Sequence, residues 1–243
     1  MIFLSIPCDK FITPRESITL IPSSKTFRET AAAALANAHE LYAEAELLAE
    51  NNHSSRAAAL AVIGVEEFAK SVAYTLTAIF PEQSDGIKSR LIQHDVKHWV
   101  ANVFEGAQIV TDELPLIVSQ ETGMWPSSRE VLTDIFVELS RNGLSGVVPN
   151  VQQAKEHRKK SKFENDQYIA TPFIKDAAFY VDISSAGEVL SPARVERFAN
   201  AEIGGLKWYL DYSRTLREVL LDDQIWERFS NGVRSRTNGF NKS

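Results

Sequence analysis

A long segment without helix-breaking residues is the feature that most constrains the fold of this chain. Residues 25–52 ("KTFRETAAAALANAHELYAEAELLAENN") are rich in strong helix formers and contain neither glycine nor proline. The polar run "NNHSS" then separates this segment from a second, more apolar helix, which we expect to begin after a serine cap at Ser54 or Ser55 and to end near Phe80. Because so few residues join the two helices, they are predicted to form an antiparallel hairpin. The many alanines predict that the first helix lies close to a neighbouring helix.

Three further helices complete the predicted fold. The third covers residues 86–118, with a bend or an end at Pro115, and the fourth covers residues 127–142, between Pro126 and Gly143. Residues 143–190 are charged and irregular, and they end in an alternating stretch that predicts a short strand and turn. Ser191 and Pro192 then match the cap and first position of a last long helix. The sequence therefore predicts an all-α bundle of about five long helices, with an irregular charged insertion and a short strand-like segment before the last of them.

The two ends of the chain differ from this central region. Residues 1–24 contain three prolines and several β-branched residues, which predicts an extended N-terminal arm. Residues 231–243 are polar, which predicts a frayed C-terminal tail. The predicted helical domain is therefore residues 25–230. With 243 residues, of which 44% are hydrophobic, the whole chain can bury a sizeable core.

Composition excludes several classes of protein. A net charge of −6 argues against a protein that coats nucleic acid generally, although it leaves room for a local basic groove. The single cysteine, Cys8, cannot form an internal disulfide framework or a cysteine-based zinc site, and it suits a reducing cytoplasm. The longest apolar run, Ala57–Val65, is far shorter than the ~20 residues that span a bilayer. We therefore expect a soluble, cytoplasmic protein without a membrane partner.

The segment "VEEFAK" places three charges on the apolar second helix. Burying a charge costs several kcal/mol unless it is paired, so Glu66, Glu67 and Lys70 need partners. Glu66 and Glu67 point about 100° apart on a helix, and Lys70 can reach either carboxylate. The third predicted helix offers partners in "QHDVKHW", with basic side chains at His94, Lys97 and His98. If the two helices pack side by side, these groups form one polar network.

Three interpretations of this network stay open at the level of sequence. The first is a buried ion-pair network that fixes how the two helices meet. The second is a metal site made by Glu66 or Glu67 with His94 and His98, but the four-helix di-metal pattern requires a histidine where this chain has Lys70. The third is a catalytic or RNA-facing cluster, with histidine moving a proton and lysine contacting phosphate. We expect no metal and no other cofactor.

A basic stretch in the insertion is a second candidate site. The segment "KEHRKKSKFEND" is either a solvated surface or a patch that binds phosphate groups. The candidate RNA-binding residues are His157, Arg158, Lys159 and Lys160. The chain contains no G-x-G-x-x-G, no phosphate-binding Gly-Lys-Ser/Thr loop and no G-x-S-x-G.

Three local patterns together resemble the AbiV family of abortive-infection proteins. The first hairpin resembles its N-x-x-x-L-x-x-(D/E)-A segment followed by E-E-x-x-K, here at Asn37, Leu41, Glu44, Ala45, Glu66, Glu67 and Lys70. His94 and Lys97 resemble its H-x-x-K. The late Y-V-D segment followed by glycine and proline corresponds to Tyr180, Val181, Asp182, Gly187 and Pro192. The resemblance covers roughly residues 27–215.

This resemblance implies a fold and a function. AbiV proteins look like members of the HEPN superfamily, whose helical bundles often dimerise and include many ribonucleases of immunity and toxin systems. The implied function is phage defence by an abortive-infection effector that suppresses host translation after infection. The implied partners are a second copy of the chain, a phage protein as activator, and RNA or the ribosome.

One departure from the superfamily pattern affects the implied chemistry. HEPN nucleases usually carry Arg-x(4–6)-His, in which arginine binds phosphate and histidine acts on the 2′-hydroxyl proton. The nearest match here is Arg90 and His94, with only three residues between them. If the chain cleaves RNA, we expect His94 as acid or base, Lys97 and Arg90 as phosphate-stabilising groups, and Glu66, Glu67 and Lys70 as supporting residues.

Two alternative functions follow from the same residues. One is a non-enzymatic helical module that binds RNA, a ribosomal surface or a phage protein. The other is a metal-dependent helical-bundle enzyme, which requires the two-histidine site.

Overall fold

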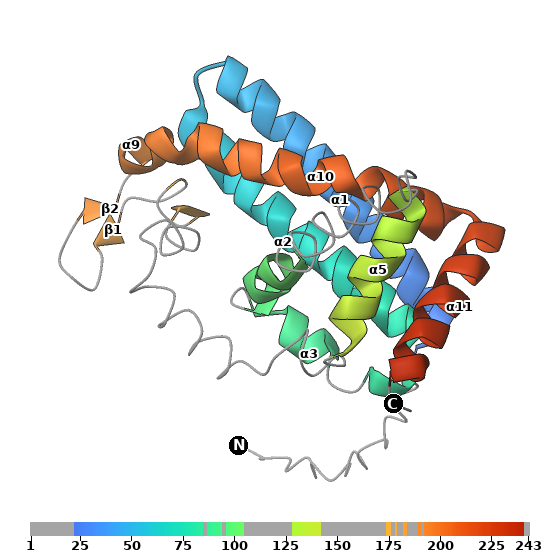
Figure 1. Ribbon diagram of the computed structural model, residues 1–243. Helices are drawn as coiled ribbons and strands as arrows, with labels where there is room; N and C mark the ends of the chain where they lie inside the picture. The colour runs from blue at the N-terminus through green and yellow to red at the C-terminus, as the bar shows by residue number, and fades with distance from the viewer. Residues whose placement is uncertain are drawn as a thin grey trace, which may run out of the picture.

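The computed structural model describes residues 22–84, 87–93, 96–104, 128–141, 174–175, 178, 182–183, 189–190 and 192–240. The first part of the predicted N-terminal arm, residues 1–21, lies outside these ranges. Over the described residues the protein is an all-α bundle, as predicted (Figure 1). No helix in these ranges combines the length and the apolar character needed to cross a membrane.

The predicted N-terminal hairpin is confirmed, but the predicted serine cap of its second helix is wrong, because Ser54 is already helical and His53 occupies the cap position without a side-chain hydrogen bond. Helix α1 covers Ser24–Glu50 and α2 covers Ser54–Ile79, and they pack against each other as neighbours in the bundle (Figure 1). The Ser23 side chain caps α1 by accepting a hydrogen bond from the Thr26 amide at 3.1 Å. Between the helices, Asn52 adopts a φ of 62°, a conformation that asparagine tolerates better than most residues. The chain therefore reverses within three residues.

Both helices of this hairpin carry buried alanines. In α1, Ala31, Ala38 and Ala45 are fully buried and recur every seventh residue. In α2, Ala57 and Ala61 are fully buried as well. Because a methyl group extends so little from the backbone, buried alanines let neighbouring helices approach closely, as the sequence predicted.

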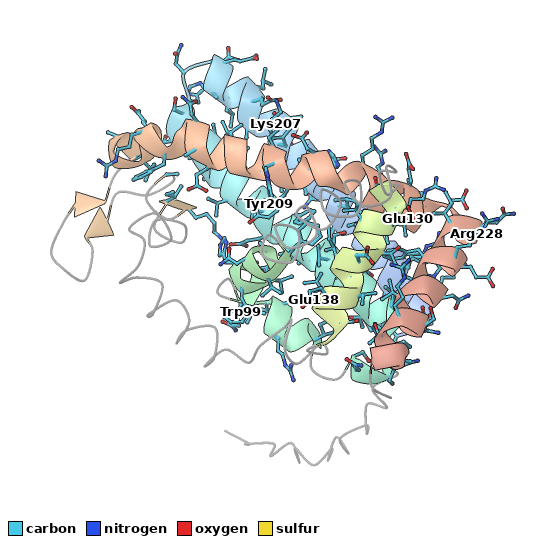
Figure 2. All side chains as sticks on the ribbon, viewed as in Figure 1. Trp99, Glu130, Glu138, Lys207, Tyr209 and Arg228 are labelled. Carbon is cyan, nitrogen blue, oxygen red and sulfur yellow. The ribbon has the colours of Figure 1, made fainter. Side chains whose placement is uncertain are left out.

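Helix α10, Ala199–Leu221, packs against both α2 and α1. A Cβ at Gly64 would overlap the side chain of Leu206, so the two backbones are close at this point. One turn further along both helices, the Phe68 and Tyr209 rings lie 5.2 Å apart, and Figure 2 shows Tyr209 where α10 passes α2. Since both contacts advance together, α2 and α10 run parallel.

Two more helices close one end of the bundle. Helix α5, Ser128–Arg141, packs against α11, Asp223–Phe240, with the Phe136 and Phe229 rings 5.3 Å apart. The predicted fourth helix is therefore confirmed within a residue at each end.

Two arginines hydrogen-bond to the last carbonyl groups of other helices. Arg234 Nε of α11 donates to the carbonyl oxygen of Ile79 at 2.7 Å, and Arg28 Nε of α1 donates to that of Leu220 at 2.7 Å. A cation at a helix C-terminus satisfies carbonyl groups that have no partner within the helix and interacts favourably with the helix dipole.

The remaining described elements are short. They are the 3-10 helix η1, Pro81–Gln83, the helix α3, Ile87–Leu91, the helical residues 96–104, the strands β1, Asp182–Ile183, and β2, Val189–Leu190, the helix α9, Pro192–Val195, and the 3-10 helix η3, Glu196–Phe198. The two strands pair antiparallel, with Asp182 opposite Leu190, which confirms the predicted strand-like segment. A helix begins at Pro192 as predicted, but η3 interrupts it before α10.

The predicted continuous third helix is wrong. Helix α3 ends at Leu91, the Gln93 amide donates to the Arg90 carbonyl oxygen as in a turn, and the chain is helical again from residue 96. Both Leu91 and Val96 are buried, and in one continuous helix they would point about 140° apart. The interruption allows both side chains to enter the core. Pro115 lies outside the described residues.

The predicted frayed tail is also replaced by a helix, because α11 continues to Phe240. Within this polar sequence, Phe229 and Val233 are buried and Trp226 packs against the core. These three residues share one face of α11, and the polar residues occupy the other faces.

Candidate functional site

Glu66 is a buried carboxylate on α2 that three basic side chains surround. Only 3% of the residue is exposed. Lys97 Nζ lies 2.5 Å from Glu66 Oε2, and Lys175 Nζ lies 3.0 Å from Glu66 Oε1. His98 Nε2 lies 3.5 Å from Glu66 Oε1. We call these four residues the Glu66 cluster.

Electrostatics keep this carboxylate ionised. Burial alone would raise the pKa of Glu66, but the imidazole of His98 and the ammonium of Lys97 outweigh burial and hold the pKa well below its ordinary value of 4.5. Lys97 is itself 95% buried from solvent, since only 5% of it is exposed. The predicted polar network between α2 and the next helical segment is thus confirmed for Glu66, Lys97 and His98.

The arrangement favours an ion-pair network over a metal site at Glu66. Each of its carboxylate oxygens already faces a lysine ammonium, and a metal ion would have to displace both. His94, the other histidine of the predicted metal site, lies outside the described residues. Within the described residues, no group of three or more histidine, cysteine, aspartate or glutamate side chains gathers as metal ligands would.

Glu67 points away from this cluster and pairs with Lys70 on the next turn of α2. Together they line a cleft of about 530 Å³ beside α1 and α2, which we call the α1–α2 cleft. From α1 come Thr30, Ala33, Ala34 and Asn37, from α2 come Glu67, Lys70 and Tyr74, and the remaining lining residues are Leu91, Ile92 and Lys97. Each helix presents one face to the cleft, since these positions recur at spacings of three, four and seven.

Two polar side chains in the cleft have no hydrogen-bond partner among the described residues. They are the exposed amide of Asn37 and the half-buried hydroxyl of Tyr74. Burial raises the pKa of the Tyr74 hydroxyl, the charge of Glu67 raises it further, and the charge of Lys70 opposes them. Lys70 is 28% exposed at its side chain, so its ammonium remains accessible from the cleft.

Lys97 connects the two parts of the site. It lines the α1–α2 cleft and forms the shortest ion pair of the Glu66 cluster. A change in the cleft that moved Lys97 would therefore also disturb Glu66.

The structure brings together only some of the predicted site residues. Glu66, Glu67, Lys70 and Lys97 form two neighbouring ion pairs. Arg90 is half-buried on α3, and it does not line the cleft. His94 and the basic stretch with His157, Arg158, Lys159 and Lys160 lie outside the described residues. The catalytic and RNA-binding roles of all these residues stay predictions.

Sequence reasoning missed several site residues. Lys175 is 109 residues away from Glu66 in the chain, and no local spacing predicts that contact. Thr30 and Tyr74 carried a usable signal, because polar residues at helical spacing on α1 and α2 mark one shared face. Asn37 was named for its place in an AbiV-like pattern but not as a site residue.

The sequence of the chain matches a known protein family. A family model of AbiV matches residues 26–202. The chain belongs to the AbiV family. This family lies in the HEPN superfamily and consists of abortive-infection proteins, which assigns the chain to phage defence. No curated protein matches the chain, and no solved structure matches it.

The AbiV match contains the whole candidate site. The α1–α2 cleft and all four residues of the Glu66 cluster fall within residues 26–202, whereas α11 falls beyond them. The site is therefore part of the AbiV region of the chain.

Proposed function

We propose that this AbiV-family protein is an abortive-infection effector that suppresses host translation after phage infection by acting on RNA. The observation that carries the proposal is the α1–α2 cleft. Asn37, Glu67, Lys70 and Lys97, which belong to two of the three AbiV-like sequence patterns, all line this one cleft. Residues from distant parts of a sequence that line one polar cleft are typical of a binding or active site.

The chemistry of the cleft suits a polar, phosphate-bearing ligand. Lys70 offers ammonium donors for phosphate, and Asn37 offers an amide that can both donate and accept. If the protein cleaves RNA, His94 supplies the acid or base and Arg90 stabilises the phosphate, as the sequence predicts.

A second candidate, inhibition by binding without cleavage, is favoured by the position of Lys97. This lysine was predicted to stabilise the phosphate, yet it is buried and paired with Glu66. Its ammonium is therefore better placed to hold the wall of the cleft in position, through its ion pair with Glu66, than to contact a reacting phosphate. In this case the protein occupies RNA or a ribosomal surface, and the basic stretch around Lys159 and Lys160 adds affinity.

A cell-free translation assay that also records RNA integrity tests the proposal. The purified full-length protein is added with and without extract of phage-infected cells, because we propose that a phage protein is the activator. Blocked translation with cleaved RNA, lost in His94→Ala, supports the nuclease. Blocked translation with intact RNA supports inhibition by binding. Undiminished translation in both reactions would contradict the proposal.

The oligomeric state is tested separately. We propose a homodimer, and analytical ultracentrifugation of the purified chain measures it. A monomer across the micromolar range would contradict this part of the proposal and leave the translation result unaffected.

A further inference from the structure

A second cleft lies where the last two helices meet the beginning of α1. It has a volume of about 660 Å³ and is lined by residues of α1, of the C-terminal end of α10 and of the beginning of α11, and we call it the α1–α11 cleft. Figure 1 shows α10 leading into α11 at this end of the bundle. The α1–α11 cleft shares no lining residue with the α1–α2 cleft, and its α10 and α11 residues lie beyond the AbiV match. It is therefore a separate site.

Arg28 presents a guanidinium group to this cleft that other side chains hold in place. Its Nε donates to the carbonyl oxygen of Leu220 at 2.7 Å, and its Nη1 donates to Asp223 Oδ1 at 2.5 Å. Its Cζ lies 5.3 Å from the centre of the Trp226 ring, within the distance of a cation–π contact. A guanidinium has five N–H donors, and only these two donate to described residues, so donors remain for a ligand.

Lys25 and Glu29 place a second, looser pair of opposite charges in the cleft. Lys25 Nζ lies 3.9 Å from Glu29 Oε1, and the two side chains are 84% and 65% exposed. The lysine precedes the glutamate on α1, which is the less favourable order for a pair four residues apart on a helix. An exposed pair of this kind contributes little to stability, so a ligand can take the place of either partner at small cost.

The charges of the lining balance each other. Lys25 and Arg28 are positive, and Glu29 and Asp223 are negative. A simple anion would meet two carboxylates and a simple cation would meet two basic groups, whereas a zwitterion finds an opposite charge for each of its ends. In a free α-amino acid the ammonium and the carboxylate are attached to one carbon, so they can pair with Lys25 and Glu29 at the same time.

Leu221 and Trp226 supply an apolar wall beside these charges. Leu221 is 64% exposed, and Trp226 is half-buried. A large apolar side chain packed on them would remove apolar surface of both molecules from water. This wall favours an amino acid such as phenylalanine or leucine over glycine.

We infer that the α1–α11 cleft binds a free α-amino acid with a large apolar side chain. The carboxylate of the ligand accepts hydrogen bonds from Arg28 and Lys25, and its ammonium donates to Glu29. Its side chain packs against Leu221 and Trp226. The volume of the cleft lies within the range of about 300–1,000 Å³ that is typical of sites for small molecules.

Isothermal titration calorimetry of the full-length protein with L-phenylalanine tests the inference. We expect saturable binding of one molecule per chain. Three analogues each lack one recognised group: phenethylamine lacks the carboxylate, hydrocinnamate lacks the ammonium, and glycine lacks the side chain. Each should bind at least about tenfold more weakly, because it loses charge-assisted hydrogen bonds or the burial of an aromatic ring.

Three substitutions at exposed positions locate the site. Lys25→Met, Glu29→Gln and Leu221→Ser should leave the thermal midpoint of the free protein unchanged, since these side chains are exposed. Each should weaken the binding of phenylalanine about two- to fivefold, the effect of one exposed contact. Lys207→Met and Leu47→Ser are matched controls on α10 and α1, because both residues are exposed and lie outside the cleft lining (Figure 2). Both should bind like the wild type.

Three results would each overturn the inference. They are no saturable binding at about millimolar phenylalanine, hydrocinnamate or phenethylamine that binds as tightly as phenylalanine, and cleft variants that bind like the two controls. The translation assay gives an independent result. If the protein blocks translation but does not bind phenylalanine, the proposed function stands and the amino-acid site is wrong. If it binds phenylalanine as expected but never blocks translation, the site stands and the proposed function is wrong.

Discussion

At the scale of single residues, Glu66 is the side chain whose charge most affects stability. Glu66→Gln keeps the shape of the side chain but leaves Lys97 and Lys175 without their buried counter-charge. We expect the free energy of unfolding at pH 7 to fall by about 3–5 kcal/mol, measured by urea denaturation. Glu67→Gln is the matched control at the adjacent position, because its ion pair with Lys70 is more exposed and should be worth less than about 1 kcal/mol.

The same carboxylate predicts how acid affects the fold. Because the pKa of Glu66 is depressed in the folded protein, its contribution to stability is complete above the ordinary value of 4.5 and is lost as the pH falls below it. Urea midpoints measured between pH 7 and pH 3 should fall more steeply for the wild type than for Glu66→Gln. Parallel curves would show that another group controls acid unfolding.

Glu202 predicts the opposite pH dependence. Burial raises the pKa of this carboxyl to about 7, and no ion pair or hydrogen bond joins it to another described residue. A raised carboxyl pKa destabilises the fold as the pH rises from about 4.5 to 7, because the folded state must then ionise a buried acid. Glu202→Gln should therefore raise the urea midpoint at pH 8 and leave it nearly unchanged at pH 4.5. A lower midpoint at pH 8 would mean that the charge of Glu202 is needed.

At the scale of helices, the contact between α2 and α10 depends on a missing side chain. In Gly64→Ala the new Cβ would overlap Leu206 Cδ2 and lie 3.1 Å from Leu206 Cδ1. Leu206 is fully buried, so it cannot move aside freely. We expect a loss of about 1–3 kcal/mol in the free energy of unfolding, from a two-state urea titration.

Gly204→Ala provides the control on the facing helix. A Cβ at Gly204 meets no atom within 4 Å, and alanine favours a helix over glycine by about 0.5–1 kcal/mol. This variant should therefore gain stability. If both alanine variants changed stability equally, helix propensity rather than packing would explain the effect at Gly64.

Helices could be predicted from sequence where local signals alone decide them. The hairpin of α1 and α2 follows from helix formers and a polar break, and α5 follows from its flanking proline and glycine. The break after Leu91 was missed because no proline or glycine marks it. It results from the need to bury both Leu91 and Val96, which is a property of the assembled core.

In the candidate site, too, some contacts could be predicted from local sequence and others could not. The pairing of Glu66 with Lys97 was predictable, because a charge on an apolar helix requires a partner and the next helical segment offered one. The contact of Lys175 was not, since it depends on where a distant segment returns to the bundle.

At the scale of the whole molecule, the last helix is required for the fold although its sequence is polar. A chain ending after Gly232 loses the buried Val233 and the hydrogen bond from Arg234 to Ile79. We expect the free energy of unfolding to fall by at least about 2 kcal/mol, since burying one valine and making one charge-assisted hydrogen bond each contribute on this order. A chain ending after Phe240 keeps both contacts and should unfold at the urea concentration of the full chain. Equal midpoints for both truncated chains would show that the end of α11 contributes nothing.

The two arginine contacts at the helix ends also bear on how each copy of the protein is made. Arg28 donates to a carbonyl group 192 residues later, and Arg234 donates to one 155 residues earlier. A ribosome adds about 5–20 residues per second, so Arg28 waits about 10–40 s for its acceptor to be synthesised. No nascent fragment therefore has the complete fold. An effector proposed to stop translation must therefore be translated as far as helix α11 before its own fold is complete.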